Sequence, residues 1–437
     1  MPTAASDAQH SVLGIHVRRS RCLERNGHCY HRGVGYPASM SKHLDRDVRF
    51  RLNRSRRGSR MVGTEAANGT ARVMKLINVC GARPNFMKIA PLMEAYRAFP
   101  SVDPLIIHTG QHYDDNMSKS FFDELSIPKP DVNLEVGSGS HARQTAEIMT
   151  RFETVLLEEK PDAVLVVGDV NSTIACVLVA CKLGIATIHV ESGLRSFDRT
   201  MPEEINRVLT DAVSDLLFVS EPSGEENLRR EGVAPERIHL VGNVMIDTLR
   251  RHLDRAKRTP VHEQLHIRKG QYGIVTLHRP GNVDCRDTLE EIFGAFQSIQ
   301  KQLPLVFCMH PRTLNQAKQY GLLGKLESLP NIQVIPPLGY LDFLHLMAEA
   351  RAIFTDSGGI QEEATILGVP CLTVRENTER PITLTHGTNK LVGVHECGIV
   401  DAFHRLDDIR NRPTQTPPLW DGQAAARIAA VIDRTFA

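Results

Sequence analysis

Ser357, Gly358 and Gly359 follow a short apolar run and precede two adjacent acids, Glu362 and Glu363, in the stretch TDSGGIQEE. Glycines let a backbone approach a ligand closely, and the free N–H groups at the start of a helix attract an anion. A carboxylate would repel that anion, so a glutamate here must serve another part of the ligand, such as the hydroxyls of a ribose. We therefore expect residues 357–359 to hold a diphosphate and one glutamate to hold a ribose diol. The alternative is that Ser357 caps the helix and the acids only complement its dipole.

Polar residues also follow the other apolar runs of this chain. Taken singly, each has a structural explanation: Asp169 could cap a helix, Glu203 could pair with Arg207, and Arg83 could be a solvated loop cation. Eight stretches at strand ends, or at the helix starts just after them, nevertheless carry His, Arg, Asp or Glu, which capping alone does not require. We therefore expect them to converge on one site. Besides TDSGGIQEE they are GARPNFMK (81–88), TGQHYD (109–114), GDVNST (168–173), HVESGLR (189–195) with MPEEINR (201–207), LHRPGNVD (277–284) and MHPR (309–312).

The apolar runs themselves have the length and the Val, Ile and Leu content of strands buried on both faces. Helix-like stretches separate them, and alternation of strand and helix predicts an α/β fold with two Rossmann-like, doubly wound domains. We place these domains at residues 74–250 and 251–420, with a terminal helix at 421–437 that could pack back on the N-terminal domain. Ligands of such folds bind beyond the carboxyl ends of the strands. The expected strands are 75–80, 103–109, 162–167, 185–190, 215–220 and 237–242, then 272–278, 304–310, 331–336, 351–356 and 369–374.

Composition narrows the class of protein. The chain is 41% hydrophobic and 24% charged, which is typical of a globular protein. Nine cysteines occur without a C-x-x-C pair, and four of them lie inside apolar runs, which indicates buried, reduced thiols. No apolar stretch approaches the roughly 20 residues that span a bilayer. These features predict a soluble, cytoplasmic protein without a disulfide framework. The four cysteines are Cys80, Cys176, Cys308 and Cys371.

Residues 1–73 form a basic head with 14 Lys and Arg against 5 Asp and Glu, whereas the remainder has 38 against 46. The head shows no helical or strand periodicity and lacks the apolar stretch of a signal peptide, so we expect it to be disordered. It could be an organelle transit peptide or a nucleic-acid arm. The alternative is that translation begins later, at Met74.

The ordered motifs from GARPNFMKIAP through TDSGGIQEEA to RENTERP resemble those of the bacterial non-hydrolysing UDP-N-acetylglucosamine 2-epimerases. The resemblance covers the chain from Met74 to its C-terminus. It implies two domains of the glycosyltransferase-B type, a homodimer, and interconversion of UDP-GlcNAc with UDP-ManNAc without a metal or a nicotinamide cofactor. It also implies a role in cell-envelope polysaccharide biosynthesis, with neither a membrane nor a nucleic acid as partner.

The resemblance further implies how the residues share the chemistry. The family eliminates UDP to give a 2-acetamidoglucal and adds UDP back, which needs acids or bases on both faces of C2 and cations for the diphosphate. Asp169, Glu191 and Glu203 would exchange the protons, with elevated pKa values. The leaving-group charge would fall to Arg83, Lys88, His278 and residues 357–359. Glu363 would hold the ribose and Phe343 would stack near uracil, with Arg207 among the substrate-binding residues.

The sequence departs from the family pattern at Asn85, Tyr113, Asp114 and Ile382. The positions of Tyr113 and Asp114 line an allosteric substrate site in some members, so these two departures weaken the expectation that a second UDP-GlcNAc activates this chain.

Several other functions share some of these residues. A UDP-sugar glycosyltransferase would have the same fold and diphosphate site, and a hydrolysing epimerase would release free ManNAc. A nucleotide-sugar sensor would keep residues 357–363 but would not use three acids. The glycines and alanine of GSGSHA (Gly137, Gly139, Ala142) suggest an NAD site, but the preceding DVNLEV alternates polar and apolar residues instead of forming a buried strand.

Overall fold

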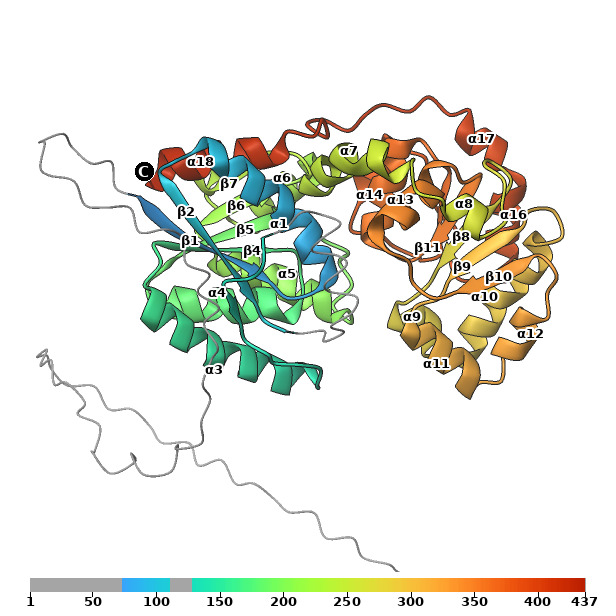
Figure 1. Cartoon of the computed structure of the whole chain (residues 1–437), viewed down its shortest axis with the longest axis horizontal. Coiled ribbons are helices and arrows are strands. Elements are labelled where there is room, and N and C mark those ends of the chain that lie inside the picture. Colours follow the sequence, from blue (N-terminus) through green and yellow to red (C-terminus); the bar gives the residue numbers. More distant parts are fainter. Residues whose placement is uncertain (1–72, 111–127, 437) are drawn as a thin grey trace, which may run out of the picture. The chain divides into compact units, whose positions relative to one another are not determined.

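The computed structural model describes residues 73–110 and 128–436 (Figure 1). The predicted head, up to residue 72, lies outside the described residues. The same holds for Tyr113 and Asp114, and for the side chain of Arg83. Both sheets of the described chain belong to one compact unit.

The first sheet is wholly parallel and has seven strands in the order β3-β2-β1-β4-β5-β6-β7. The chain reverses its direction of growth between β1 and β4, and ligands of doubly wound folds bind at that kind of switch point. The strands are β1 (Met74–Cys80), β2 (Val102–His108), β3 (Val132–Asn133), β4 (Ala163–Val167), β5 (Ala186–Ser192), β6 (Leu216–Val219) and β7 (Ile238–Leu240).

The second sheet repeats this plan with six parallel strands in the order β10-β9-β8-β11-β12-β13, so its switch point lies between β8 and β11. The strands are β8 (Gly273–Thr276), β9 (Leu305–Cys308), β10 (Ile332–Ile335), β11 (Ala352–Thr355), β12 (Cys371–Thr373) and β13 (Asn389–Leu391).

Helices connect successive strands and cover the sheets. Around the first sheet these are α1 (Arg83–Ala95), α3 (His141–Glu159), α4 (Asn171–Lys182), α5 (Pro202–Val213) and α6 (Pro222–Arg230), followed by α7 (Val244–Ala256) and α8 (Val261–Gln264). Around the second they are α9 (Pro280–Val283), α10 (Arg286–Ile299), α11 (Pro311–Gln319), α12 (Leu323–Glu327), α13 (Tyr340–Ala348), α14 (Gly358–Leu367), α15 (Pro381–Thr385), α16 (Glu396–His404) and α17 (Leu406–Arg410), and α18 (Ala424–Phe436) ends the described chain.

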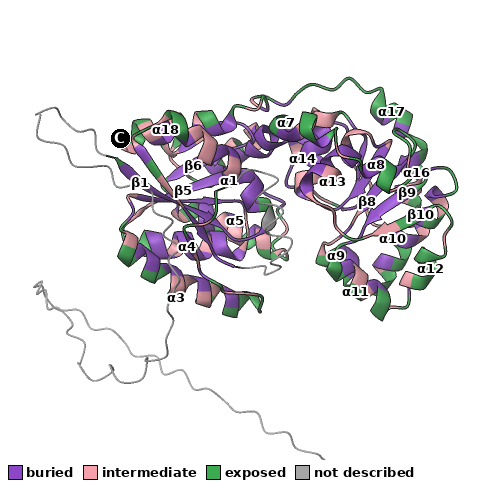
Figure 2. Cartoon of the chain, in the orientation of Figure 1, coloured by how far each residue is buried: buried purple, intermediate pink, exposed green. Residues whose placement is uncertain are grey.

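Burial explains why the short apolar runs become central strands. All five residues of β4 and all four of β11 are buried, and the exposed residues gather on the outer faces of the helices (Figure 2). Strands with helices on both faces have no solvent-facing side, so a continuous apolar run suits them better than an alternating one. The prediction of two doubly wound α/β domains is confirmed, and a strand lies within every predicted run. DVNLEV was not expected to form a buried strand, and it contributes only the two-residue edge strand β3.

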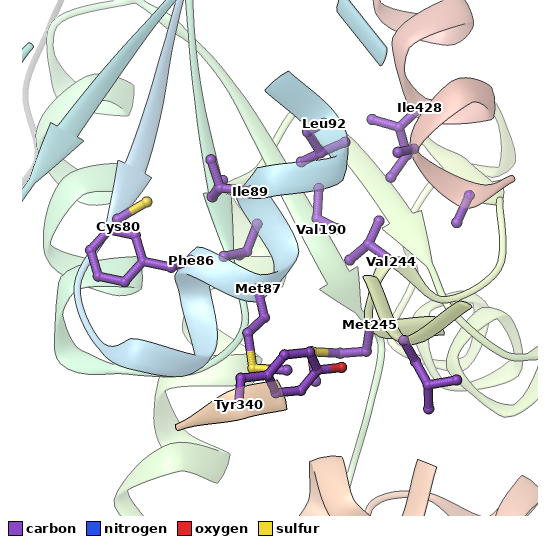
Figure 3. Close-up of a cluster of buried hydrophobic side chains, with 14 of the residues drawn as sticks. Cys80, Phe86, Met87, Ile89, Leu92, Val190, Val244, Met245, Tyr340 and Ile428 are labelled. Carbon is purple, nitrogen blue, oxygen red and sulfur yellow. The ribbon is translucent and has the colours of Figure 1, made fainter. Parts of the chain in front are cut away.

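Helix α7 lies between the helices of the first sheet and those of the second. It packs against α1 on one side and against α13 and α14 on the other, and Met245 of α7 belongs to the same buried cluster as Met87 and Tyr340 (Figure 3). The terminal helix α18 packs on α1 and α7. The Asp247 carboxylate accepts the N–H groups of Ala424 and Ala425, at 3.2 and 2.7 Å, where α18 begins. A cap of this kind fixes the helix end against α7.

The cysteine prediction is confirmed for Cys80, Cys176, Cys308 and Cys371, which are free and buried.

Asn85, one of the departures from the family pattern, has a structural role at the switch point of the first sheet. Its Oδ1 accepts the N–H groups of Gly81 and Ala82, and its Nδ2 donates to the carbonyl of Val167. These bonds tie the end of β1 to the end of β4.

Candidate active site

Residues from both sheets line one cavity of about 380 Å³ at the carboxyl ends of the strands. The first sheet contributes side chains that follow β1, β4 and β5, and the second contributes residues that follow β8, β10 and β11. The polar residues of the lining are Lys88, Asp169, Glu203, His278, Arg279, Tyr340, Ser357, Glu362, Glu363, Glu379 and Arg380.

The N-terminus of α14 opens into this cavity. Ser357 is the residue before the helix, yet its side chain makes no capping hydrogen bond, so the alternative that it serves only as a cap is not what the structure shows. A Cβ at Gly358 would lie 2.7 Å from Oε1 of Glu379, so any larger residue there would require the Glu379 side chain to move. A ten-residue helix with an unused hydroxyl and free N–H groups at its start is suited to an anion.

The two adjacent acids of α14 have different partners. Glu362 is ion-paired with the guanidinium of Arg380, whereas Glu363 accepts a hydrogen bond from the Tyr340 hydroxyl at 2.9 Å. Both carboxyl groups are buried. Burial raises the pKa of Glu362, and it raises the pKa of Glu363 to about 8, with the nearby charge of Glu362 adding to the shift.

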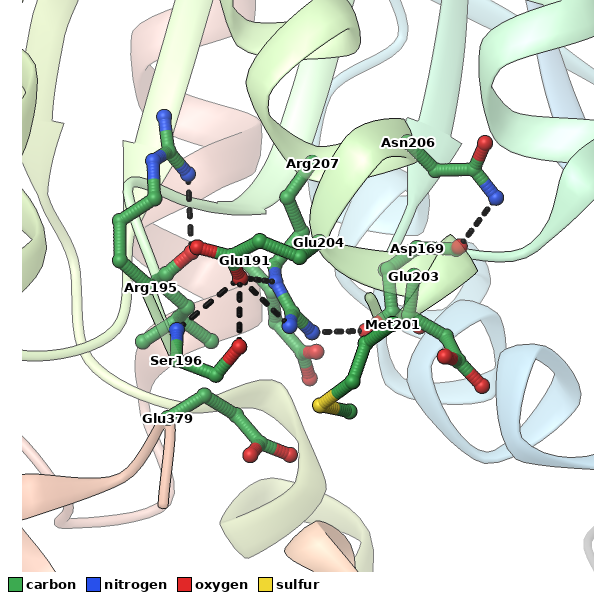
Figure 4. A network of polar contacts seen from close by, with 12 residues as sticks. Asp169, Glu191, Arg195, Ser196, Met201, Glu203, Glu204, Asn206, Arg207 and Glu379 are labelled. Carbon is green, nitrogen blue, oxygen red and sulfur yellow. Dashed lines mark hydrogen bonds and ion pairs between the residues drawn. The ribbon is translucent and has the colours of Figure 1, made fainter. Parts of the chain in front are cut away.

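Asp169 lies at the switch point of the first sheet, between β4 and α4. The guanidinium of Arg207 bridges the carboxylates of Asp169 and Glu204, with Nη2 of Arg207 2.8 Å from Oε2 of Glu204 (Figure 4). Burial opposes ionisation of Asp169, but the positive charge of Arg207 and of the other cations around it outweighs burial and lowers the pKa. The expectation of an elevated pKa is therefore wrong for Asp169, because cations surround it.

Glu191, the second-last residue of β5, has a strained conformation. Its φ is +68°, in the left-handed region that non-glycine residues seldom adopt, and the pairing of β5 with β6 is irregular at this point. Oε2 lies 2.6 Å from Nζ of Lys88 and 3.6 Å from Arg380, while the buried Oε1 has no hydrogen-bond partner among the described residues. Backbone strain next to an unsatisfied buried oxygen is typical of a functional site.

Asp356 holds His278 in place. The buried carboxylate lies 2.9 Å from Nδ1 of His278 and accepts the backbone N–H groups of His278 and Arg279 as well as Nδ2 of Asn282. Although burial alone would raise the pKa of Asp356, the interactions with His278 and these donors lower it. With Nδ1 held, Nε2 of His278 is the ring nitrogen available to a ligand in the cavity.

Arg279 connects the two sides of the cavity. It reaches Glu203 of the first sheet and Glu379 of the second, in each case at 3.4 Å. Glu379 also pairs with Arg375 at 2.8 Å. Burial alone would raise the pKa of Glu379, but the charges of Arg380, Arg375, Arg279 and Arg207 hold it well below its usual range. Acids and cations from both sheets therefore form one continuous network.

Nine of the twelve predicted site residues line the cavity: Lys88, Asp169, Glu203, His278, Phe343, Ser357, Gly358, Gly359 and Glu363. Glu191 and Arg207 are one contact further away, paired with Lys88 and Asp169. The side chain of Arg83 lies outside the described residues. The prediction missed Tyr340, Arg279, Glu379 and Arg380. The last three stand in the motifs LHRPGNVD and RENTERP, which could have identified them, whereas Tyr340 stands in an apolar helix and had no such signal.

The raised pKa values lower the net negative charge of the cavity. The lining holds the cations Lys88, Arg279 and Arg380 against five acids. Glu362 and Glu363 both take up a proton more readily than an exposed glutamate. A raised pKa at either acid reduces the negative charge that an anionic ligand would meet.

Two other hollows occur in the described chain. One of about 450 Å³ is lined by residues of α10, α12 and α16, which include acids and buried apolar side chains. The other, of about 350 Å³, shares Glu203 and Arg279 with the cavity. The described residues contain no group of three or more His, Cys, Asp and Glu side chains arranged to hold a metal ion. None of the helices within residues 73–110 and 128–436 is long and apolar enough to cross a membrane.

Comparison with known proteins gives the same family as the motifs. The family profile described as UDP-N-acetylglucosamine 2-epimerase matches residues 94–433. A Methanocaldococcus jannaschii protein named UDP-N-acetylglucosamine 2-epimerase is 43% identical over 364 residues, covering 82% of this chain and 99% of the relative. A Pseudomonas aeruginosa protein named UDP-2,3-diacetamido-2,3-dideoxy-D-glucuronate 2-epimerase is 42% identical over 359 residues, covering 82% of this chain and 98% of the relative.

A solved structure is also similar along nearly the whole described chain. The crystal structure of the Methanocaldococcus jannaschii UDP-GlcNAc 2-epimerase in complex with UDP-GlcNAc and UDP superimposes with a TM-score of 0.78. It is 43% identical and covers 83% of this chain and 100% of that one.

The raised pKa of Glu363 generates a prediction about stability. The folded state holds this proton up to a pH of about 8, whereas an exposed glutamate loses it near pH 4.5. The free energy of unfolding should therefore fall as the pH rises between these values. Glu363→Gln keeps an acceptor for Tyr340 but carries no charge, so at pH 8.5 it should be more stable than the wild type by on the order of 2 kcal/mol, with a smaller difference at pH 5.

Urea unfolding at pH 5 and pH 8.5 measures this difference, with Glu226→Gln, an exposed glutamate of α6, as the control. A difference between Glu363→Gln and wild type that does not change with pH would contradict the raised pKa.

Proposed function

This chain belongs to the UDP-N-acetylglucosamine 2-epimerase family, and we propose that it inverts C2 of UDP-GlcNAc by eliminating UDP and adding it back to a 2-acetamidoglucal. The single observation that carries the proposal is the cavity, which brings acids, cations and a helix N-terminus from both sheets within reach of one ligand. A nucleotide sugar offers matching parts: an anionic diphosphate, a ribose diol and a sugar carbon that must lose a proton.

The elimination step is assigned as follows. A carboxylate removes the proton from C2, the C–H electron pair forms the C1=C2 double bond, and the bond between C1 and the UDP oxygen breaks. Asp169 is suited to the base role because its lowered pKa keeps it ionised. Glu191 and Glu203 are the further acids, and the unpartnered Oε1 of Glu191 can accept or donate a proton. Re-addition delivers a proton to the opposite face of C2 while UDP attacks C1.

The departing diphosphate gains negative charge, so cations and donors must already be in place for it. Lys88 and His278 line the cavity together with the α14 N-terminus, and Asp356 fixes the His278 ring. Arg83 stays a prediction for this role. Phe343 lines the same cavity at the helix that follows β10, which supports its assignment next to uracil. Arg207 is assigned to orient Asp169, with which it is paired.

The family relationship supports an epimerase over the glycosyltransferase, the sensor and the NAD enzyme. Which sugar the enzyme takes is a separate proposal. The Pseudomonas aeruginosa relative is named for a diacetamido uronate, and it is almost as similar to this chain as the Methanocaldococcus jannaschii relative. We assign UDP-GlcNAc from the sugar that the latter is named for. A cytoplasmic location and a role in cell-envelope polysaccharide synthesis stay predictions.

Amide substitutions test the acids while keeping their shape. Asp169→Asn, Glu191→Gln and Glu203→Gln should each lower kcat by roughly 10² to 10⁴, because an amide cannot exchange the proton. The KM for UDP-GlcNAc should change much less. Purified protein is incubated with UDP-GlcNAc alone and the products are followed by proton NMR, with the exposed Glu226→Gln as the control.

UDP-ManNAc in equilibrium with UDP-GlcNAc is the expected product of the wild type. Free ManNAc with UDP would instead indicate a hydrolysing enzyme. Wild-type turnover in all three amide variants would remove the acid-base assignment.

The homodimer is likewise a proposal, and α5 offers a surface for it. Ile205 and Leu209 lie one helical turn apart and remain 47% and 49% exposed, and Phe197 just before the helix is 70% exposed. Exposed apolar side chains grouped in this way often mark an interface between protein copies.

Leu209→Glu should shift the protein from dimer to monomer in sedimentation velocity, because burying an unpaired charge at an interface is costly. Gln319→Lys, on the exposed side of α11, is the control for a new surface charge. A wild type that sediments as a monomer, or a variant that remains a dimer, would contradict this surface.

A further inference from the structure

The buried carboxyl group of Glu363 makes a hydrogen bond with Tyr340 that has no role in the proposed elimination. The residue is only 3% exposed, and its Oε1 accepts the Tyr340 hydroxyl at 2.9 Å. No other hydrogen bond to this carboxylate occurs among the described residues, and both Glu363 and Tyr340 line the cavity. The second carboxylate oxygen is therefore available to a ligand, while Tyr340 occupies the first.

The ring of Tyr340 has little freedom to move. Tyr340 is 5% exposed and belongs to the buried cluster that contains Met87 of α1 and Met245 of α7 (Figure 3). The ring of His252, also on α7, lies 6.3 Å from it between centroids. A close-packed ring keeps its hydroxyl in one place, and the hydroxyl in turn limits rotation of the Glu363 carboxylate.

Orientation of this carboxylate matters for binding a diol. Two neighbouring hydroxyls donate best to a carboxylate whose plane is already set, because the ligand then does not have to order the side chain. The hydrogen bond also favours the ionised form, since it lowers the pKa of Glu363 against the effect of burial.

We propose that Tyr340 is a positioning residue for nucleotide recognition, whose hydroxyl orients Glu363 to accept both ribose hydroxyls of UDP. This inference rests on the proposed function and on the expectation from the family resemblance that Glu363 holds the ribose. It goes further in assigning to Tyr340, which starts helix α13 and carries no reacting group, the discrimination between ribose and deoxyribose.

Tyr272 provides a matched control. It is a buried tyrosine of the same apolar cluster, and its hydroxyl donates to the carbonyl of Leu346 at 2.7 Å and lies 2.9 Å from Nε2 of His262. It does not line the cavity. Tyr340→Phe and Tyr272→Phe each remove one buried hydroxyl from the same core, but only Tyr340→Phe releases an acid in the cavity.

The experiment compares UDP with 2′-deoxyuridine diphosphate by isothermal titration calorimetry on the full chain. The wild type should prefer UDP. Tyr340→Phe should weaken UDP binding about 10-fold, the usual effect of losing one hydrogen bond, and should weaken binding of the deoxy ligand much less. The preference for ribose should therefore collapse in Tyr340→Phe, as in Glu363→Ala, and persist in Tyr272→Phe. KM for UDP-GlcNAc should rise in Tyr340→Phe with kcat nearly unchanged.

The possible outcomes distinguish the role of Tyr340 from the assignment of Glu363 to the ribose. A folded Tyr340→Phe that keeps the wild-type preference, while Glu363→Ala loses it, overturns the role of Tyr340 and leaves the ribose assignment intact. Unchanged UDP affinity in Glu363→Ala removes the ribose assignment and the role of Tyr340 with it. Equal binding of the two nucleotides by the wild type also overturns the inference. This measurement uses only the wild-type protein, so it does not depend on whether a variant folds.

Discussion

The rest of the site depends on the ion pairs that the buried guanidinium of Arg380 makes with acids of both sheets. This guanidinium is ion-paired with Glu362 of α14 and lies 3.6 Å from Glu191, the second-last residue of β5 in the first sheet. A buried charge is tolerated only when opposite charges surround it, so Arg380 requires both acids to remain in place. Arg279 makes a second connection of this kind between Glu203 and Glu379. The strand ends of both sheets are therefore held together by charge, around a cavity that a ligand can enter.

This network also explains how neighbouring acids come to differ. Asp169 lies among cations and its pKa is lowered, whereas Glu363 has only a tyrosine hydroxyl and its pKa is raised by burial. The left-handed backbone of Glu191 indicates that the fold tolerates strain to place that carboxylate. Stability and chemistry here depend on the same ion pairs.

The sequence predicted the two sheets because β4 and β11 are continuous apolar runs, and burial on both faces leaves no other pattern for them. It predicted most of the cavity because most of the lining acids and cations stand in the loops or first helical turns that follow such runs. The partners of those residues were not predictable, because pairing depends on which strand ends meet in space. Glu362 and Glu363 are neighbours in sequence, yet only the structure shows that one faces Arg380 and the other Tyr340. The pKa of Asp169 was mispredicted for the same reason, since the effect of its cations depends on their distance.

Exchange of the C2 hydrogen tests the central claim, proton removal by a carboxylate inside this cavity, most directly. The purified chain is incubated with UDP-GlcNAc in D2O without any added nicotinamide, and the C2 position of the recovered UDP-GlcNAc is followed by NMR. Elimination predicts that deuterium replaces the C2 hydrogen, and that a small amount of UDP and 2-acetamidoglucal escapes into solution. Epimerisation that retains the original hydrogen at C2 would contradict elimination and would indicate a redox route instead.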